Sequence, residues 1–449
     1  MKHTARLTAC LLALALTACT AAPQDVPAGT TTETAAAPVQ TAEPTTETPA
    51  VQGTLTPIYT TWGAAVGQDA VYSAMNIDDA GQYFATTIDF STGEQRILCK
   101  KLGCSHADES CPAYMTAIRN GCVPQAMLLP VGDRLYWLVD GRHNESDSAY
   151  LDVSNPDGSD RRRVAEGDDL PDLTNAYVWY TDGTALYTFV RGYDKYSVLR
   201  LDEGGAACFF IRSIPDGEDY FAVGCWQDKI VLQHSGGYLQ QPLNPVGEAA
   251  TDEELRAWLA ADEQARNEQT KNLCLLDTAG GMTDTDMTWG GNAGNVQLVH
   301  NGAAYVLNES GLVTKFDLTA GTAQTRQLDL QGVSYGVVEG ARLDGWIPVT
   351  VRDDSEGLLN PETGVYTPLP TTWLKDQSIE RSPFIVAASD TMLLVKYGEI
   401  YYTTNDIGTD GAPYSFTTCR GEYGIISVKD YLAGSQDWVQ VTLQGRDLV

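Results

Sequence analysis

Short apolar segments recur along the chain from about residue 57 to residue 443, and Gly, Asp and Asn separate them. The runs at residues 134–139 and 392–397 are typical, because they are five to eight residues long and rich in aromatic or branched side chains. Such segments favour β-strands, and the small polar residues between them favour tight turns. The pattern therefore predicts an all-β chain.

A recurring turn divides these strands. In seven places a strand-like segment ends in Asp or Asn and a Gly follows a few residues later. The Asx residues are Asp89, Asp152, Asp202, Asp277, Asp317, Asn360 and Asn405. The Asx side chain can bond its own backbone, and Gly accepts the positive φ of a hairpin turn. Their spacings are 63, 50, 75, 40, 43 and 45 residues, and a base period near 40–50 matches one four-stranded propeller blade. We predict a seven-bladed β-propeller closed by radial repetition, with an eighth blade as the alternative for the strands that follow the seventh turn.

One segment departs from the strand pattern. Residues 251–254 form a capping box, and Leu255, Trp258 and Leu259 follow at helical spacing. We predict a helix inside an insertion at about residues 237–271, between the second and third strands of a blade. Such a loop leaves from the same rim as the connections between blades. The helix either caps the central mouth by packing Trp258 on the propeller or forms a lid that contacts a ligand or partner.

A cysteine-rich stretch follows the first predicted turn. Cys99, Cys104, His106 and Cys111 fall within thirteen residues. Three thiolates and an imidazole are the ligand set of a closed tetrahedral zinc site, which would be structural. Disulfides are the alternative, since the protein is predicted to be exported and eight of its ten cysteines lie beyond the N-terminal signal region. Disulfides leave His106 unexplained, and free thiols are a third possibility. We expect the stretch in the connection between the first two blades.

A polar loop adds a third elaboration. His143, Asn144, Glu145 and Asp147 lie between two predicted strands, in the same kind of loop as the helix. Together with Trp258 they form our candidate binding face, which the cysteine-rich loop should border.

The N-terminus predicts export. Residues 1–18 combine a basic start with an apolar core, and residues 16–19 (Leu-Thr-Ala-Cys) resemble a bacterial lipobox. This resemblance implies cleavage before Cys19 and a diacylglyceryl thioether on its sulfur; an ordinary signal peptide is the alternative. Residues 19–55 are rich in Thr, Ala, Pro and Glu and predict a disordered tether, before a propeller domain at residues 56–449. We expect a lipid-anchored protein of the cell membrane that faces the extracellular or periplasmic side.

The net charge of the chain limits the classes of partner that we expect. The chain has 29 basic and 59 acidic side chains, a net charge of −30. Nucleic acids and anionic lipid surfaces would be repelled, whereas a glycan, peptide or protein ligand is compatible. The sequence contains no Gly-x-Ser-x-Gly, His-Glu-x-x-His or Gly-Lys-Ser/Thr motif, so we assign no catalytic residue and, besides structural zinc, no cofactor. We expect a monomer.

Residues 150–164 carry a family resemblance. Their strand, Asp-Gly-Ser turn and basic exit resemble the repeat of TolB-type propellers. The chain as a whole resembles propeller lipoproteins of Firmicutes. The resemblance rests on the lipobox, the tether, the cysteine-rich stretch and blades whose repeats are only loosely similar to one another. The resemblance implies a fold and a location but no activity.

We therefore predict a binding or interaction module that works through the candidate binding face, on the side that carries the helical insertion and the cysteine-rich loop. The alternative is a carbohydrate-active enzyme, a hydrolase or lyase, with carboxylates at the propeller mouth. Carboxylates converging beside exposed Trp or Tyr would favour the enzyme, and a mouth covered by the helix would favour binding.

Overall fold

The computed structural model describes most of the chain beyond the predicted tether. The described residues are 53–60, 64–76, 82–117, 125–140, 149–171, 173, 176–192, 194–237, 251–330, 343–351, 355–369, 372–373, 380–381, 383–407, 413–444 and 447–448. The predicted signal peptide, Cys19 and the tether up to residue 52 lie outside these ranges.

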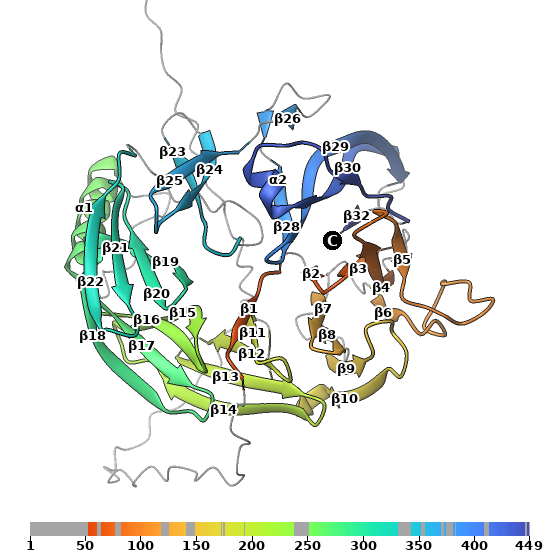
Figure 1. The fold of residues 1–449 in the computed structure, drawn as a ribbon, viewed down its shortest axis with the longest axis horizontal. Coiled ribbons are helices and arrows are strands. Elements are labelled where there is room, and N and C mark those ends of the chain that lie inside the picture. Colours follow the sequence, from red (N-terminus) through yellow and green to blue (C-terminus); the bar gives the residue numbers. More distant parts are fainter. Residues whose placement is uncertain are drawn as a thin grey trace, which may run out of the picture. The chain divides into compact units, whose positions relative to one another are not determined.

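Residues 49–449 form a compact unit whose sheets are arranged as blades around a common centre (Figure 1). Seven blades are present, so the predicted seven-bladed β-propeller is confirmed. Blades 2 to 5 are regular, with four antiparallel strands each. From the innermost strand outwards they are β7 (Gln125–Val131), β8 (Arg134–Asp140), β9 (Tyr150–Ser154) and β10 (Arg162–Glu166); β11 (Ala176–Thr181), β12 (Leu186–Arg191), β13 (Lys195–Asp202) and β14 (Gly205–Ser213); β15 (Asp219–Trp226), β16 (Lys229–Gly236), β17 (Thr270–Asp277) and β18 (Met282–Gly290); and β19 (Asn295–His300), β20 (Ala303–Leu307), β21 (Leu312–Asp317) and β22 (Thr322–Gln327).

The other three blades are less regular. Blade 1 contains β2 (Ala65–Val66), β3 (Ala70–Asn76), β4 (Gln82–Asp89), β5 (Gln95–Ile97) and β6 (Tyr114–Ala117). The described strands of blade 6 are β23 (Ile347–Val351), β24 (Ser355–Asn360) and β25 (Val365–Pro368), and the small hairpin β26 (Thr372–Trp373) and β27 (Glu380–Arg381) follows them. Blade 7 contains β28 (Phe384–Ala388), β29 (Met392–Ile407), β30 (Pro413–Ser427) and β31 (Val439–Gln440). Strand β1 (Thr56–Ile58) adds an extra innermost strand to blade 3 by pairing with β11.

The core lies between neighbouring blades. Successive side chains of a strand point to opposite faces of its sheet, so the fully buried Tyr136 and Trp137 of β8 enter two different clusters. Tyr136 packs in the cluster shared with blade 3, and Trp137 packs in the cluster shared with blade 1. Burying each large apolar side chain contributes about 1.5–3 kcal/mol. A strand that is apolar on both faces, as β8 is, therefore stabilises two blade contacts.

In blades 1 to 5 the predicted Asx turns join the third and fourth strands, and in blade 6 the turn at Asn360 joins β24 and β25. In blade 1 the carboxylate of Asp89 accepts the backbone N–H groups of Ser91 and Thr92, both at 2.9 Å, and Gly93 has a φ of 68°. These turns share one rim with the turns between first and second strands; we call it the turn rim. The loops between second and third strands and the connections between blades leave from the opposite rim, which we call the α1 rim.

The seventh Asx turn lies at a different place in its blade from the other six. Asn405 lies in β29, the second strand of blade 7, so the hairpin of β29 and β30 joins second and third strands. The ends of β29 and β30 at Ile407 and Pro413 therefore lie on the α1 rim. An Asx residue followed by Gly can end any hairpin, so the pattern could not distinguish the two positions.

The C-terminal segment closes the ring. After β30 the short helix α2 (Val428–Leu432) leads to β31, the outer strand of blade 7. Thr442 then donates its N–H to the carbonyl of Gly93 in blade 1 at 2.9 Å, and β32 (Asp447–Leu448) pairs with β3. The strands after the seventh turn therefore complete blade 7 and join it to blade 1.

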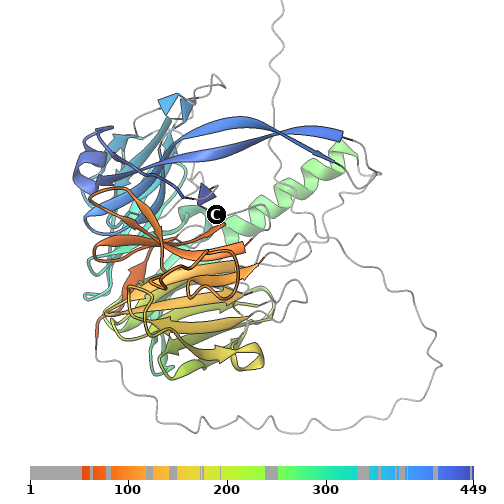
Figure 2. The ribbon, with the colours of Figure 1, turned by 90° about the vertical axis from the view of Figure 1, so that its right-hand side faces the viewer.

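The predicted helix is α1 (Asp252–Glu268), inserted between β16 and β17 of blade 4. Its capping box is formed, because Thr251 and Glu254 bond each other's backbone N–H groups. Figure 2 shows α1 and the β29–β30 hairpin extending from the same side of the propeller. Among the described helices, none combines the length and apolar character needed to cross a membrane.

Candidate functional site

The cysteine-rich stretch lies at the outer edge of blade 1, not in a connection between blades as expected. Strand β5 pairs with the second half of β4, and β6 pairs with its first half. Residues 98–113 therefore interrupt the outer strand of the blade, halfway between the rims. Turn spacing located the extra residues correctly but could not show that the chain returns to the same strand.

The four predicted ligands converge. One ligand atom from each of Cys99, Cys104, His106 and Cys111 lies within 4.8 Å of all the others. His106 Nδ1 is 3.3 Å from Cys111 Sγ. A tetrahedral zinc site with bonds of about 2.0–2.3 Å holds its ligand atoms roughly 3.5–4 Å apart, so small inward movements would complete it. The cluster can hold a metal ion.

The surroundings of the sulfurs differ. The backbone N–H of His106 lowers the pKa of Cys104, whereas burial raises the pKa of Cys111 to about 12. Cys111 is 3% exposed and packs with Phe84 and Trp137. A buried thiol becomes a thiolate only if a cation compensates the charge, which is what metal coordination does. Three sulfurs and one imidazole leave no open position, so such a site would be structural.

A second feature is a cleft on the α1 rim, between α1 and blades 3, 4 and 5. Its volume is about 1190 Å³, above the few hundred to 1,000 Å³ of most small-molecule sites. We call it the α1 cleft. Its described lining is Arg191, Asp194, Ile214, Pro215, Asp216, Gly217, Glu218, Asp219, Phe221, Gln233, Ser235, Asp262, Glu263, Arg266, Asn267, Gln269, Lys271, Gly291, Asn292, Gly294, Asn295, Asn308, Glu309 and Ser310.

The three basic residues of this lining are occupied by the protein itself. Arg191 Nε lies 2.7 Å from an Asp219 carboxylate oxygen, and Arg266 pairs with Asp262 one turn earlier on α1. Lys271 is 6% exposed, and its Nζ donates to the carbonyl of Gly294 at 3.0 Å, while burial lowers its pKa. The three basic side chains are therefore held in contacts within the cleft wall.

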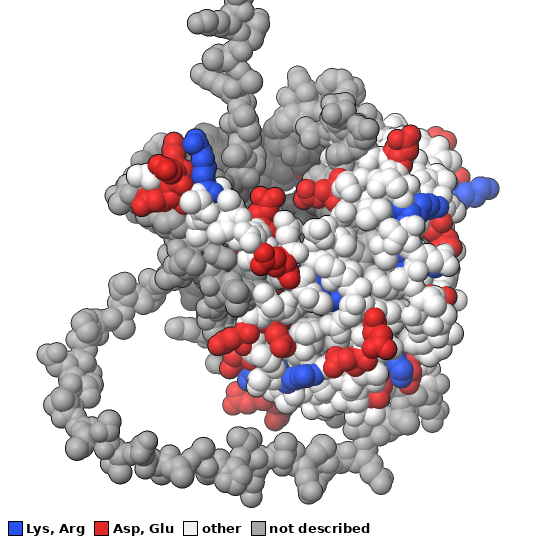
Figure 3. All heavy atoms as spheres, turned by 90° about the vertical axis from the view of Figure 1, so that its left-hand side faces the viewer, with Lys and Arg blue, Asp and Glu red and all other residues white. Residues whose placement is uncertain are grey.

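Acidic side chains dominate the charged part of the α1 cleft lining. The described lining has seven acidic and three basic side chains. Asp194, Asp216, Glu263 and Glu309 are exposed and make no ion pair with a described residue. Figure 3 shows acidic side chains prevailing on the side of the propeller that carries α1. The cleft therefore attracts positive charge.

The candidate binding face is described only in part. His143, Asn144, Glu145 and Asp147 lie outside the described residues, so their part of the predicted face stays a prediction. Trp258 is half-buried on α1, while Leu259 is 48% exposed. The buried residues of α1 are instead Asp262 and Ala265, nearer its C-terminal end.

Sequence reasoning missed Glu263 and Glu309. Both lie on elements of the α1 rim, and the Asx-Gly sequence at residues 308–311 marked one of these loops. None of the described lining residues is Trp or Tyr; Phe221, 39% exposed, is the aromatic contribution. Figure 1 shows α1 at the periphery of the ring and not over its centre, so the expectation that the helix caps the propeller mouth was wrong. The helix instead lines the α1 cleft, and the criterion of a helix-covered mouth is not met.

Comparison with known proteins identifies no family for this chain. No family model matches the sequence, and no curated protein matches it. Several solved structures are similar at low sequence identity. A functionally unknown protein from Desulfotomaculum acetoxidans is 10% identical, with 85% of this chain and 98% of that chain covered and a TM-score of 0.37. AztD from Citrobacter koseri is 11% identical, with coverages of 67% and 68% and a TM-score of 0.30. BamB from Moraxella catarrhalis is 14% identical, with coverages of 67% and 95% and a TM-score of 0.25.

Proposed function

We propose that this protein is a binding module that takes a cationic peptide segment, bearing Lys or Arg, in the α1 cleft. One observation carries the proposal: the cations of the cleft are consumed by internal contacts, whereas Asp194, Asp216, Glu263 and Glu309 face solvent. A cleft of about 1190 Å³ has room for several residues of a partner chain. Charge complementarity of this kind steers encounter and selects partners.

The test uses the full-length protein and a fluorescent Lys-Gly repeat peptide, with binding followed by anisotropy. Glu263 and Glu309 are both changed to Lys. We expect roughly tenfold weaker binding, because like charges now face the ligand. Binding of the unaltered protein should also weaken at high salt.

The matched control changes Asp133 and Asp390 to Lys. Both are exposed residues in turns on the turn rim, and the change in net charge is the same. This variant should bind the peptide nearly as well as the unaltered protein. Equal losses in both variants would mean that overall charge, not the cleft, attracts the peptide, and preferential binding of a neutral oligosaccharide would contradict the proposed ligand class.

We also propose that the metal held by Cys99, Cys104, His106 and Cys111 is zinc. The soft thiolates, the imidazole and the closed set of four ligands support this choice. Mass spectrometry and metal analysis of the purified protein should find one zinc ion per chain and unbridged cysteines at these positions. Disulfides that involve Cys104 or Cys111, without zinc, would contradict it.

The proposed location follows from the N-terminal sequence. We propose that Cys19 carries a lipid and that the tether holds the propeller off the outer surface of the membrane. Cys19→Ser should release the protein from the membrane fraction and abolish acyl labelling. Retention of the acyl label in this variant would exclude the assigned anchor.

A further inference from the structure

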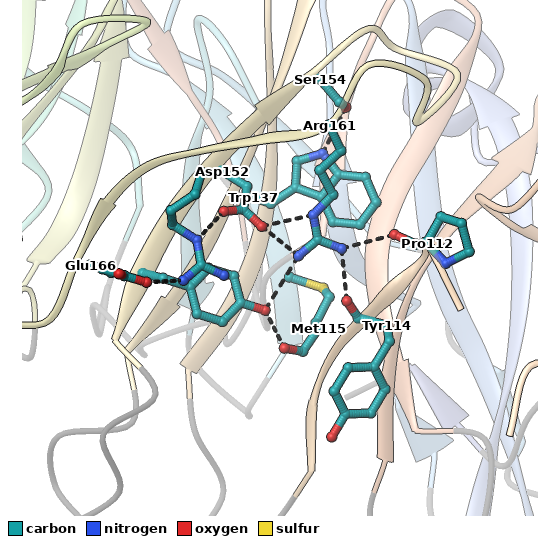
Figure 4. A network of polar contacts seen from close by, with 10 residues as sticks. Pro112, Tyr114, Met115, Trp137, Asp152, Ser154, Arg161 and Glu166 are labelled. Carbon is teal, nitrogen blue, oxygen red and sulfur yellow. Dashed lines mark hydrogen bonds and ion pairs between the residues drawn. The ribbon is translucent and has the colours of Figure 1, made fainter. Parts of the chain in front are cut away.

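The loop that carries the predicted metal ligands is held to blade 2 through its backbone carbonyls (Figure 4). Arg161 donates from Nη1 to the carbonyls of Pro112 at 2.9 Å and Tyr114 at 2.7 Å. The hydroxyl of Tyr150 donates to the carbonyl of Met115. These carbonyls follow Cys111 directly along the chain, at the start of β6, which β4 also holds by pairing. The position of Cys111 therefore contributes to where they point.

The blade 2 side of this contact is already held in place. Arg161 Nε lies 2.7 Å from Asp152 Oδ2, and its guanidinium carbon lies 4.0 Å from the centre of the Trp137 ring. Asp152 is 3% exposed and also pairs with Arg163. Arg161 is therefore preorganised, and the loop is the part that must be positioned.

Ala85 of β4 holds both ends of the loop, by accepting the N–H of Leu98 at 2.9 Å and donating to the carbonyl of Ala113 at 2.8 Å. Between these ends the loop has few contacts besides the four ligands. Between Cys99 and Cys111 the described backbone hydrogen bonds are local, such as Cys104 N–H to the carbonyl of Lys101 at 3.2 Å. Leu102 is 99% exposed. The ion pair of Lys100 with Asp157 is exposed on both sides, and such pairs contribute little. Only the cysteines of this segment, above all Cys111, reach the cluster that contains Phe84 and Trp137.

We infer that metal binding at the cysteine cluster locks the contact between blades 1 and 2 through Arg161. This inference rests on the proposed metal site. Binding draws Cys111 into the cluster and holds the next carbonyls in place for Arg161 and Tyr150. By linkage, an intact Arg161 contact strengthens metal binding, and a bound metal strengthens the contact. The arginine run at residues 161–163 belongs to blade 2 and the cysteine-rich stretch belongs to blade 1. On this inference the two segments act together across the contact between the blades.

The first test measures zinc affinity of the full-length protein by competition with a chromophoric chelator. Arg161→Ala should weaken zinc binding by roughly tenfold, as expected for groups in one network. Arg162→Ala is the matched control, because Arg162 bonds Glu203 and points away from the loop. Its affinity should equal that of the unaltered protein. Equal affinity in Arg161→Ala and Arg162→Ala would overturn the coupling.

The second test needs no variant. Hydrogen exchange of the unaltered protein is compared before and after zinc removal. Removal should speed exchange in residues 111–117 and in β9 and β10 of blade 2, but not in blade 5. Changes confined to residues 99–111 would overturn the lock although zinc binds, whereas a protein that binds no zinc at all would refute the proposed metal site itself.

Discussion

A Cβ atom on Gly291 would lie 1.9 Å from the carbonyl oxygen of Arg266, so the C-terminal end of α1 rests directly on the backbone of Gly291. The Gly291 N–H also donates to the carbonyl of Gln269 at 2.7 Å. This contact joins α1 to the connection between blades 4 and 5 and so sets the width of the α1 cleft.

Gly291→Ala should therefore displace α1. Forcing a methyl group into a closed contact costs about 1–3 kcal/mol, and we expect faster hydrogen exchange in α1 and weaker binding of the cationic peptide. Gly290→Ala is the control, because its Cβ would meet only the side-chain oxygen of Asn292, at 3.3 Å. Similar effects in both variants would show that α1 does not depend on this contact.

Loss of the helix cap should act on α1 alone. Thr251→Ala removes the side chain that accepts the Glu254 N–H, which costs about 1 kcal/mol of helix stability. We expect faster exchange in the first turn of α1 and an unchanged melting temperature of the propeller. Thr251→Ser keeps the acceptor and should behave like the unaltered protein; a lower melting temperature in Thr251→Ala would mean that the blades depend on this helix.

Asp152 should be essential to the contact between blades 1 and 2. It is buried between Arg161 and Arg163, and Asp152→Asn would leave both guanidinium groups partly uncompensated. Because both arginines retain some exposure, we expect a loss of about 2–4 kcal/mol in the free energy of unfolding, measured with urea. Glu203→Gln breaks the exposed pairs with Arg134 and Arg162 and should cost less than about 1 kcal/mol.

The first Asx turn should make stability depend on acid pH. Hydrogen bonds from the Ser91 hydroxyl and from the Thr92 and Ser91 backbone lower the pKa of Asp89 to about 2. A lowered pKa stabilises the fold at pH values above the unfolded pKa, about 3.9, and this contribution is lost as pH falls towards 2. Asp89→Asn should melt earlier than the unaltered protein at neutral pH, and the difference should shrink between about pH 4 and pH 2. A difference in melting temperature that stayed constant between about pH 4 and pH 2 would contradict this account.

The strand pattern and six turns were predictable because each depends on neighbouring residues. Asp89 bonds N–H groups two and three positions away, and Thr251 bonds Glu254. Such contacts can be found by reading along the chain. The hairpin at Asn405 shows the limit, since the same local pattern occurs at two different places in a blade.

The convergence of Cys99, Cys104, His106 and Cys111 was also predictable, because all four lie within thirteen residues. Their placement was not. That β6 returns to β4 is a pairing between segments about thirty residues apart, and no local signal encodes it.

By itself, the sequence determined the fold class, the blade period, the capped helix and the grouping of three cysteines with one histidine, because these depend on side chains close together in the chain. Only the tertiary structure decided that the cysteine loop lies against Arg161 and that Glu263 and Glu309 share a cleft. The physical reason is that ring closure brings together the rims of separate blades, and the resulting contacts depend on how whole sheets pack, which no single segment specifies.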